Sequence, residues 1–228
     1  MTMLRKLAQD LWVAERPLPI AVGDLGARMT VLRGASGGLM LHSPVALDAP
    51  LRQSLEQCGP VQWVVGPNKA HHLFLGDYSA AYPRAQLCAA PGLADKRKDL
   101  RFQHTLGQSL PDGWPGDVHV QLIEGAPLMN EVALLHAPSQ TLVLTDLVFN
   151  VQHGERNRAR VFHWLVGATG RFGPHRLIRL GIRDATAARR SIDAILAWDF
   201  ERLIMSHGDV LERGGRTMLE AAFRYLRA

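Results

Sequence analysis

Three separate apolar runs of this chain each lead into residues that could bind a metal. The candidate ligands are His71, His72, Asp146 and His207. Each follows a short stretch of apolar and β-branched residues, which is typical of a buried strand. Imidazole nitrogens combined with a carboxylate oxygen suit zinc, iron or manganese. Because sites are commonly built where strands end at one edge of a sheet, the pattern predicts a metal site made from these four side chains.

Two residues near the paired histidines could also take part in chemistry. Asp77 lies on the helix expected after His72, where it could be a further ligand, a general base or a proton shuttle, or a carboxylate on a solvated helix face. Lys69 is either an exposed loop lysine or an ammonium group that replaces a lost metal's charge by pairing with Asp146. The histidines themselves could instead cap a helix or bond to backbone carbonyls. The residues alone therefore leave a metal site and a metal-free site open.

The stretch GASGG at residues 34–38 matches the G-x-S-x-G pattern of serine hydrolases. In those enzymes the serine lies between a strand and a helix, whereas here the strand-like sequence LMLHS follows. The pattern therefore predicts a hairpin turn. Ser36 would act as a nucleophile only if a histidine lay within hydrogen-bond reach.

Apolar runs and helical periodicities alternate along the chain. We expect strands at 28–33, 39–43, 61–65, 86–90, 118–123, 131–136, 141–145 and 202–205. We expect helices at 49–58, 72–82, 91–98, 156–166, 185–197 and 214–226. The order repeats, which predicts one domain over residues 1–228 that is built from two similar halves. The natural arrangement is two β-sheets packed face to face with helices outside.

Composition indicates a globular protein with a large core. The chain has 228 residues, of which 47% are hydrophobic. No apolar run approaches the roughly 18 residues of a membrane span, and the first residues carry charge throughout, so we expect neither a membrane protein nor a secretory signal. Two cysteines, Cys58 and Cys88, lack the CxxC spacing of a zinc knuckle, which indicates buried thiols in a cytoplasmic protein.

Positive charge is concentrated in one segment of the chain. The net charge is +5, and residues 150–190 hold nine arginines against Glu155 and Asp184. This Arg156–Arg190 segment could orient a small anionic substrate or contact nucleic acid or an acidic partner. The plainer interpretation is a solvated helix face with local ion pairs.

The order of a strand with a histidine loop, a strand ending in aspartate and a strand ending in histidine and glycine resembles the metallo-β-lactamase superfamily. Longer stretches, among them VVGPNKAHHLFLGD and SQTLVLTDLVFN, are similar to a small uncharacterised bacterial family of degenerate metallo-β-lactamase-like proteins. A PNKxHH loop and a TDLVFN strand end recur in that family. The resemblance covers nearly the whole chain and implies an α/β fold, a four-layer αββα sandwich of metallo-β-lactamase type.

Departures from the superfamily pattern imply an incomplete metal site. The first two histidines of its HxHxDH motif fall at Pro67 and Lys69, neither of which can bind a metal. The histidine before the strand that starts at Glu131 is also missing. The resemblance therefore implies that the first metal position has lost its ligands. The second metal position keeps four candidate ligands. His72 stands at the place of the last motif histidine, and His71 stands at the place of the motif aspartate. Asp146 stands at the place of the bridging aspartate, and His207 at the place of the final histidine.

With one divalent metal (zinc, iron or manganese) the superfamily chemistry is hydrolysis, because the metal lowers the pKa of water toward neutrality. The resemblance thus implies a mononuclear metal-dependent hydrolase of a small, anionic substrate. The alternative is a non-catalytic scaffold, without a metal, that binds a small anionic ligand, a partner protein or nucleic acid. Steeply salt-dependent binding would favour nucleic acid.

Overall fold

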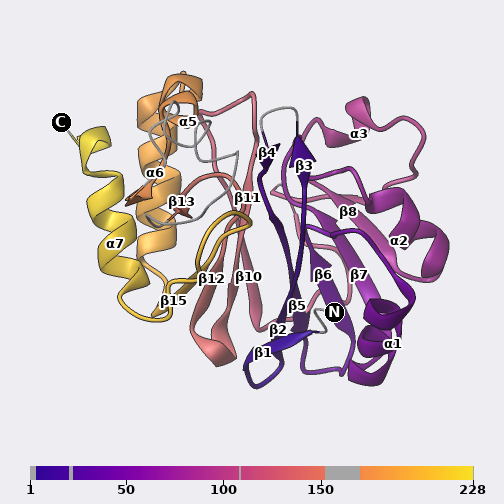
Figure 1. The fold of residues 1–228 in the computed structure, drawn as a ribbon. Coiled ribbons are helices and arrows are strands. Elements are labelled where there is room, and N and C mark those ends of the chain that lie inside the picture. Colours follow the sequence, from indigo (N-terminus) through magenta and orange to yellow (C-terminus); the bar gives the residue numbers. More distant parts are fainter. Residues whose placement is uncertain (1–3, 21–22, 108, 152–169, 228) are drawn as a thin grey trace.

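The computed structural model describes residues 4–20, 23–107, 109–151 and 170–227 and shows an α/β fold in four layers. Two β-sheets lie face to face, and helices cover the outer face of each (Figure 1). Three hydrophobic clusters fill the three spaces between the layers. The expected four-layer αββα sandwich is therefore confirmed.

The first sheet has seven strands in the order β1-β2-β5-β6-β7-β8-β9. Neighbouring strands from β1 to β6 pair antiparallel, and those from β6 to β9 pair parallel. The strands are β1 (Arg5–Ala8), β2 (Leu11–Arg16), β5 (Ala27–Arg33), β6 (Leu39–His42), β7 (Val61–Gly66), β8 (Gln86–Ala89) and β9 (His104–Thr105). Parallel pairs need crossovers, which contain α1 (Ala49–Cys58), α2 (Leu75–Ala81) and α3 (Leu93–Lys96). A separate short hairpin joins β3 (Pro19–Ile20) and β4 (Gly23–Asp24).

The second sheet has four strands in the order β10-β11-β12-β15. They are β10 (Val118–Leu122), β11 (Val132–His136), β12 (Thr141–Val143) and β15 (Arg202–Ile204), and β12 and β15 run parallel. Its outer face is covered by α6 (Ala185–Leu196) and α7 (Gly215–Ala222). The remaining elements are η1 (Ala137–Ser139), β13 (Phe149–Val151), β14 (Arg171–Gly173), α5 (Arg176–Gly181) and η2 (Arg224–Arg227).

The alternation of side chains along a strand determines which hydrophobic cluster each side chain belongs to. In β6 and β7, Met40, Trp63 and Val65 point into the space between the sheets. Leu41 and Val64 point to the opposite face, against α1 and α2. Because successive side chains alternate in a strand, a strand buried on both faces reads as a continuous apolar run. This is the pattern that predicted β7.

Helix α1 shows how the local sequence fixes an element boundary. The Asp48 side chain accepts a hydrogen bond from Leu51 N at 2.8 Å, and Pro50 lies in the first turn. Leu51 and Leu55 form the buried face. The helix spans the expected residues 49–58. Helix α2 begins at Leu75, later than the expected residue 72.

Several other expectations can be compared with the structure. The GASGG stretch is the β5–β6 hairpin turn, where Ser36 Oγ lies 3.5 Å from Gln62 Oε1. Both cysteines are free thiols, Cys88 buried and Cys58 half-buried. Among the described helices, none has the length and apolar character needed to cross a membrane. The expected helix at 156–166 lies outside the described residues.

Candidate metal centre

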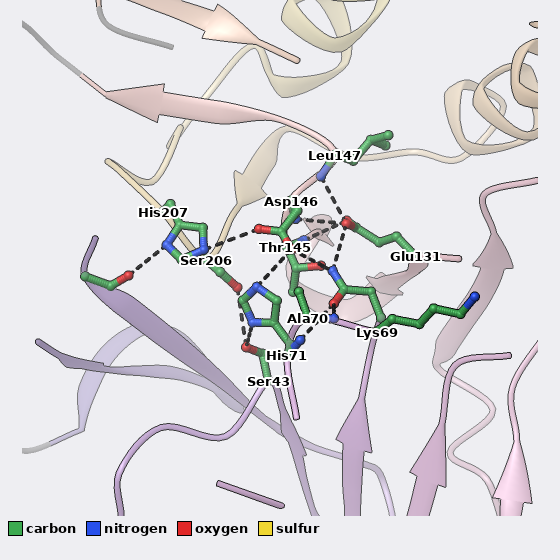
Figure 2. Close-up of polar contacts among 12 residues, drawn as sticks. Ser43, Lys69, Ala70, His71, Glu131, Thr145, Asp146, Leu147, Ser206 and His207 are labelled. Carbon is green, nitrogen blue, oxygen red and sulfur yellow. Dashed lines mark hydrogen bonds and ion pairs between the residues drawn. The ribbon is translucent and has the colours of Figure 1, made fainter. Parts of the chain in front are cut away.

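Loops at one edge of the sandwich bring His71, Asp146 and His207 together (Figure 2). They follow β7, β12 and β15, respectively. Asp146 and His207 are neighbours because β12 and β15 run parallel and end at the same edge. The ligand atoms of the three residues all lie within 4.8 Å of one another.

Asp146 lies between the two imidazoles. Its Oδ2 is 3.1 Å from His71 Nε2, and its Oδ1 is 3.3 Å from His207 Nε2. The three side chains are 12%, 11% and 2% exposed for Asp146, His71 and His207. Two ligand atoms bound to one tetrahedral zinc ion at about 2.1 Å are separated by about 3.4 Å. The observed separations therefore suit a shared ion as well as a shared proton.

The rear nitrogen of each imidazole has a fixed partner. His207 Nδ1 is 2.7 Å from the carbonyl oxygen of Gly26, and His71 Nδ1 is 2.7 Å from Ser43 Oγ. A carbonyl oxygen only accepts, so His207 Nδ1 carries a proton. Its Nε2 then faces the Asp146 carboxylate either as an imidazolium N–H or with a lone pair. A lone pair directed at a carboxylate requires a cation between them, so the donor set fits a metal ion.

Asn68 holds the histidine loop against Asp146. Its Oδ1 accepts hydrogen bonds from Ala70 N at 2.8 Å and His71 N at 2.9 Å, which forms an Asx turn after β7. Its Nδ2 donates to Asp146 Oδ2 at 2.8 Å and to Thr145 Oγ1 at 3.0 Å. Because the oxygen is engaged by two N–H groups, the amide must present its nitrogen to the carboxylate. One side chain therefore positions two of the three candidate ligands.

Glu131 fixes the backbone around Asp146. Its Oε1 accepts from Thr145 N at 2.8 Å, and its Oε2 accepts from Asp146 N at 2.8 Å and Leu147 N at 3.0 Å. The residue is 1% exposed. It immediately precedes β11, which runs antiparallel to β12, so it lies opposite the end of β12. A buried carboxylate with three backbone donors is a rigid support for the residue it surrounds.

Burial and mutual charge set the protonation of the cluster. Burial alone would raise the pKa of Asp146, but the charges and hydrogen bonds of His71 and His207 hold it well below its ordinary value. Burial would lower the pKa of His71, yet the Asp146 carboxylate and then Glu131 raise it overall. Burial and the charge of Asp146 raise the pKa of Glu131. Negative charge therefore centres on Asp146, and cationic charge is favoured on the His71 imidazole beside it.

Sequence comparison identifies the family. The sequence profile of a family described as "Domain of unknown function (DUF4336)" matches residues 8–161. The chain belongs to this family. A search of curated proteins gave no significant match.

Solved metallo-β-lactamases share the fold of this DUF4336 protein. The metallo-β-lactamase from Pontibacter korlensis has a TM-score of 0.66 at 12% identity, covering 100% of this chain and 99% of the other. The one from Hirschia baltica has a TM-score of 0.66 at 11% identity, with 98% and 96% covered. FIM-1 from Pseudomonas aeruginosa, in its mono-zinc form, has a TM-score of 0.65 at 11% identity, with 99% and 95% covered. These identities establish the fold alone.

Three of the residues singled out from the sequence of the DUF4336 protein lie away from the cluster. His72 faces Arg97, whose Nη1 lies 3.5 Å from His72 Nδ1. The Lys69 side chain extends away from Asp146, as Figure 2 shows, and its Nζ donates to the carbonyl of Pro127 at 2.8 Å. Asp77 is exposed on α2. The Asx turn at Asn68 fixes the backbone at Ala70 and His71, and the His71 side chain points to Asp146.

Replacing His72 by alanine should leave zinc affinity within about twofold of the parent, because His72 lies outside the cluster. The His72 imidazole is half-buried. Its burial and then the charges of Lys96 and Arg97 lower its pKa, which favours the neutral form. The same change at His71 removes a candidate ligand and should weaken zinc binding. Competition with a chromogenic chelator measures both variants. Equal losses in the two would contradict the placement of the histidines.

Proposed function

We propose that this protein is a hydrolase that uses one divalent metal ion (zinc, iron or manganese) held by His71, Asp146 and His207. The orientation of the two imidazoles carries the proposal. Each directs Nε2 at the same carboxylate, and each holds its Nδ1 against Ser43 Oγ or the Gly26 carbonyl. Metal-binding histidines characteristically have such a rear partner, which fixes the ring and its tautomer.

Three protein ligands leave a coordination position for water or substrate, as in catalytic zinc sites. A divalent ion held there supplies Lewis acidity and a nucleophile at neutral pH. The protein's own contribution is a rigid frame. Asn68 and Glu131 hold Asp146, and Phe149 stacks on His207 with ring centroids 5.5 Å apart and planes at 12°. The low exposure of the ligands limits solvent screening around the reacting groups.

Exposed arginines support a small anionic substrate. Arg176, Arg179 and Arg183 are exposed on α5 and the turn that follows it. Arg189 and Arg190 form local ion pairs with Asp193 and Glu124 at 3.5 and 3.9 Å. The arginines at positions 156, 158 and 160 lie outside the described residues. Arg179 lies over the Tyr225 ring, with its Cζ 4.0 Å from the ring centroid. An exposed guanidinium such as that of Arg176 or Arg183 favours carboxylate or phosphate groups.

Metal content tests the proposal. Untagged protein purified without chelator, and a second sample incubated with added metal, are analysed by plasma mass spectrometry. About one equivalent of zinc, iron or manganese is expected. Metal far below stoichiometric in both samples would overturn the hydrolase proposal.

One observation favours the alternative, a metal-free scaffold that binds a small anionic ligand. Asp146 is paired with two imidazoles and with the Asn68 amide, so the polar network can close with a proton in the place of an ion. The metal analysis decides between the two, because the scaffold predicts that no stoichiometric metal is retained.

The zinc-induced increase in unfolding temperature should grow as pH rises from 6.5 to 8. A raised histidine pKa adds stability below the unfolded-state pKa of about 6.5, and this stability is lost as pH rises through the folded-state pKa. The metal-free protein therefore loses part of the contribution of its raised His71 pKa as pH rises above 6.5. Zinc replaces that proton, so the loaded protein keeps its stability. Scanning calorimetry of zinc-loaded and chelator-treated protein measures the difference. An increase that shrinks with pH would contradict the prediction.

A further inference from the structure

An apolar cavity lies next to the metal centre. Its volume is about 200 Å³, and its walls come from the loop between β10 and β11, from Leu147 and from α5. Leu128, Met129, Leu177 and Ile178 are among the lining residues. Glu131 is the one charged residue of the lining, and its carboxylate oxygens are already engaged by three backbone N–H groups.

Phe149 contacts both the cavity lining and one of the candidate ligands, although it does not itself line the cavity. Met129 and Ile178 pack in one cluster with Phe149, and Phe149 stacks on the His207 ring. On the other side, Leu147 follows Asp146 directly and donates its N–H to Glu131. The cavity lining is therefore linked to the ligands through Phe149 and through the Asp146–Leu147 backbone.

Two leucine side chains that line the cavity are exposed to solvent. Leu128 is 63% exposed and Leu177 is 55% exposed. Exposed leucines are ordinary when they are scattered singly. Here two of them, from separate elements, line the same hollow beside a polar site.

Size and polarity define what the cavity can hold. Whole ligands of drug size occupy about 300–1,000 Å³, so about 200 Å³ suits one part of a molecule. An engineered apolar cavity of about 150 Å³ stays dry and binds benzene. A charged or hydroxylated group would lose its hydration here without gaining partners.

We infer that this cavity receives an apolar arm of the substrate, a short alkyl chain or a single aromatic ring, while the group to be hydrolysed lies at His71, Asp146 and His207. The inference rests on the proposed function. It narrows the substrate class to small esters, amides or phosphoesters that carry one compact apolar substituent.

A series of hydroxamic acids tests the inference by binding, without turnover. Acetohydroxamic, butanohydroxamic, hexanohydroxamic and benzohydroxamic acids share a metal-chelating head and differ in the apolar part. Calorimetry on zinc-loaded protein should show affinity rising about fourfold per methylene until the cavity is filled, which corresponds to about 0.8 kcal/mol for each buried CH₂. Affinity independent of chain length would overturn the inference and leave the metal proposal intact.

A matched pair of variants on α5 localises the effect. Leu177 lines the cavity, whereas Leu180, on the same helix and 79% exposed, does not. Leu177→Asn should lower the increase in hydroxamate affinity to less than about twofold per methylene, and Leu180→Asn should leave that increase unchanged. Equal effects of the two substitutions would contradict the assignment.

A further experiment tests ligand binding in the cavity even if no metal binds. Failure of acetohydroxamic acid to bind zinc-treated protein would count against the proposed function. Toluene is then titrated into chelator-treated protein with labelled leucine and isoleucine methyl groups. Shifts at Leu128, Leu177 and Ile178 are expected, and unchanged methyl signals would overturn the cavity as a binding site whatever the metal result.

Discussion

Asp146→Asn should lower zinc affinity by more than about 100-fold. Loss of an outer partner of a metal ligand already costs about 10–100-fold, and Asp146 is itself the group that both His71 and His207 face. The variant should also lose about 3 kcal/mol of unfolding free energy without metal, because a buried ion pair is broken from one side. Zinc affinity is measured by chelator competition, and stability by urea denaturation.

Asp77→Asn is the matched control for this substitution. Asp77 is exposed on α2, and its carboxyl is not among the clustered ligands. The control should bind zinc as the parent does. Asp146→Asn protein that retained zinc within about tenfold of the parent would remove Asp146 from the ligand set, since that loss is smaller than expected even for an outer partner.

Glu131→Gln should lower the unfolding free energy by about 2 kcal/mol and weaken zinc binding about 10–100-fold. The carboxylate accepts from Thr145 N, Asp146 N and Leu147 N with both oxygens. The glutamine amide keeps one oxygen and turns an NH₂ group toward backbone N–H donors, so at least one buried donor loses its acceptor. Urea denaturation and chelator competition provide the two readings.

Glu124→Gln serves as the control because the Glu124 side chain is 53% exposed and lies 3.9 Å from Arg190. Surface changes of this kind stay within about 0.5 kcal/mol. Parental stability in Glu131→Gln would show that the carboxylate does not hold the Asp146 loop.

The sequence predicted that Asp146 and His207 would lie close together, because strand direction is a simple constraint. A short apolar run followed by Asp146 or His207 places each side chain at the end of its strand, and parallel pairing of β12 and β15 then makes them neighbours. The choice between His71 and His72 depends on the turn before them. An asparagine directly after a buried strand is an Asx-turn signal, and reading Asn68 in this way would have directed attention to His71.

Glu131 was placed at the start of a strand from the sequence and was given no functional role. A charged residue at the head of the otherwise apolar segment VALLH is the available signal, because a buried charge must have partners. Those partners are backbone N–H groups of Thr145, Asp146 and Leu147, which no side-chain motif records. Lys69 was predicted to be either an exposed loop lysine or a partner of Asp146; the Asn68 amide contacts Asp146, and Lys69 Nζ donates to the Pro127 carbonyl.

The helices and strands were predicted well where periodicity is strong. Helix α1 and strands β7 and β8 lie within one residue of the expected bounds. Helix α2 begins later than expected, because residues 68–72 are held in the Asx turn and its connections. The six-residue helix α5 was not predicted, since its two turns are too short to show a clear period.

The hydrogen bond between His207 and Gly26 joins residues 181 positions apart in the chain. Two neighbouring contacts are similarly distant: Arg28 Nη1 donates to the Met205 carbonyl across 177 positions, and Ser206 Oγ donates to Ser43 Oγ across 163. Contacts of such long range close only after both sheets have assembled, because loop-closure entropy opposes them until then. We therefore expect the cluster to form after the folding transition state. An ion bound there would slow unfolding and leave the folding rate unchanged, so its benefit to the protein is a longer lifetime of the native state.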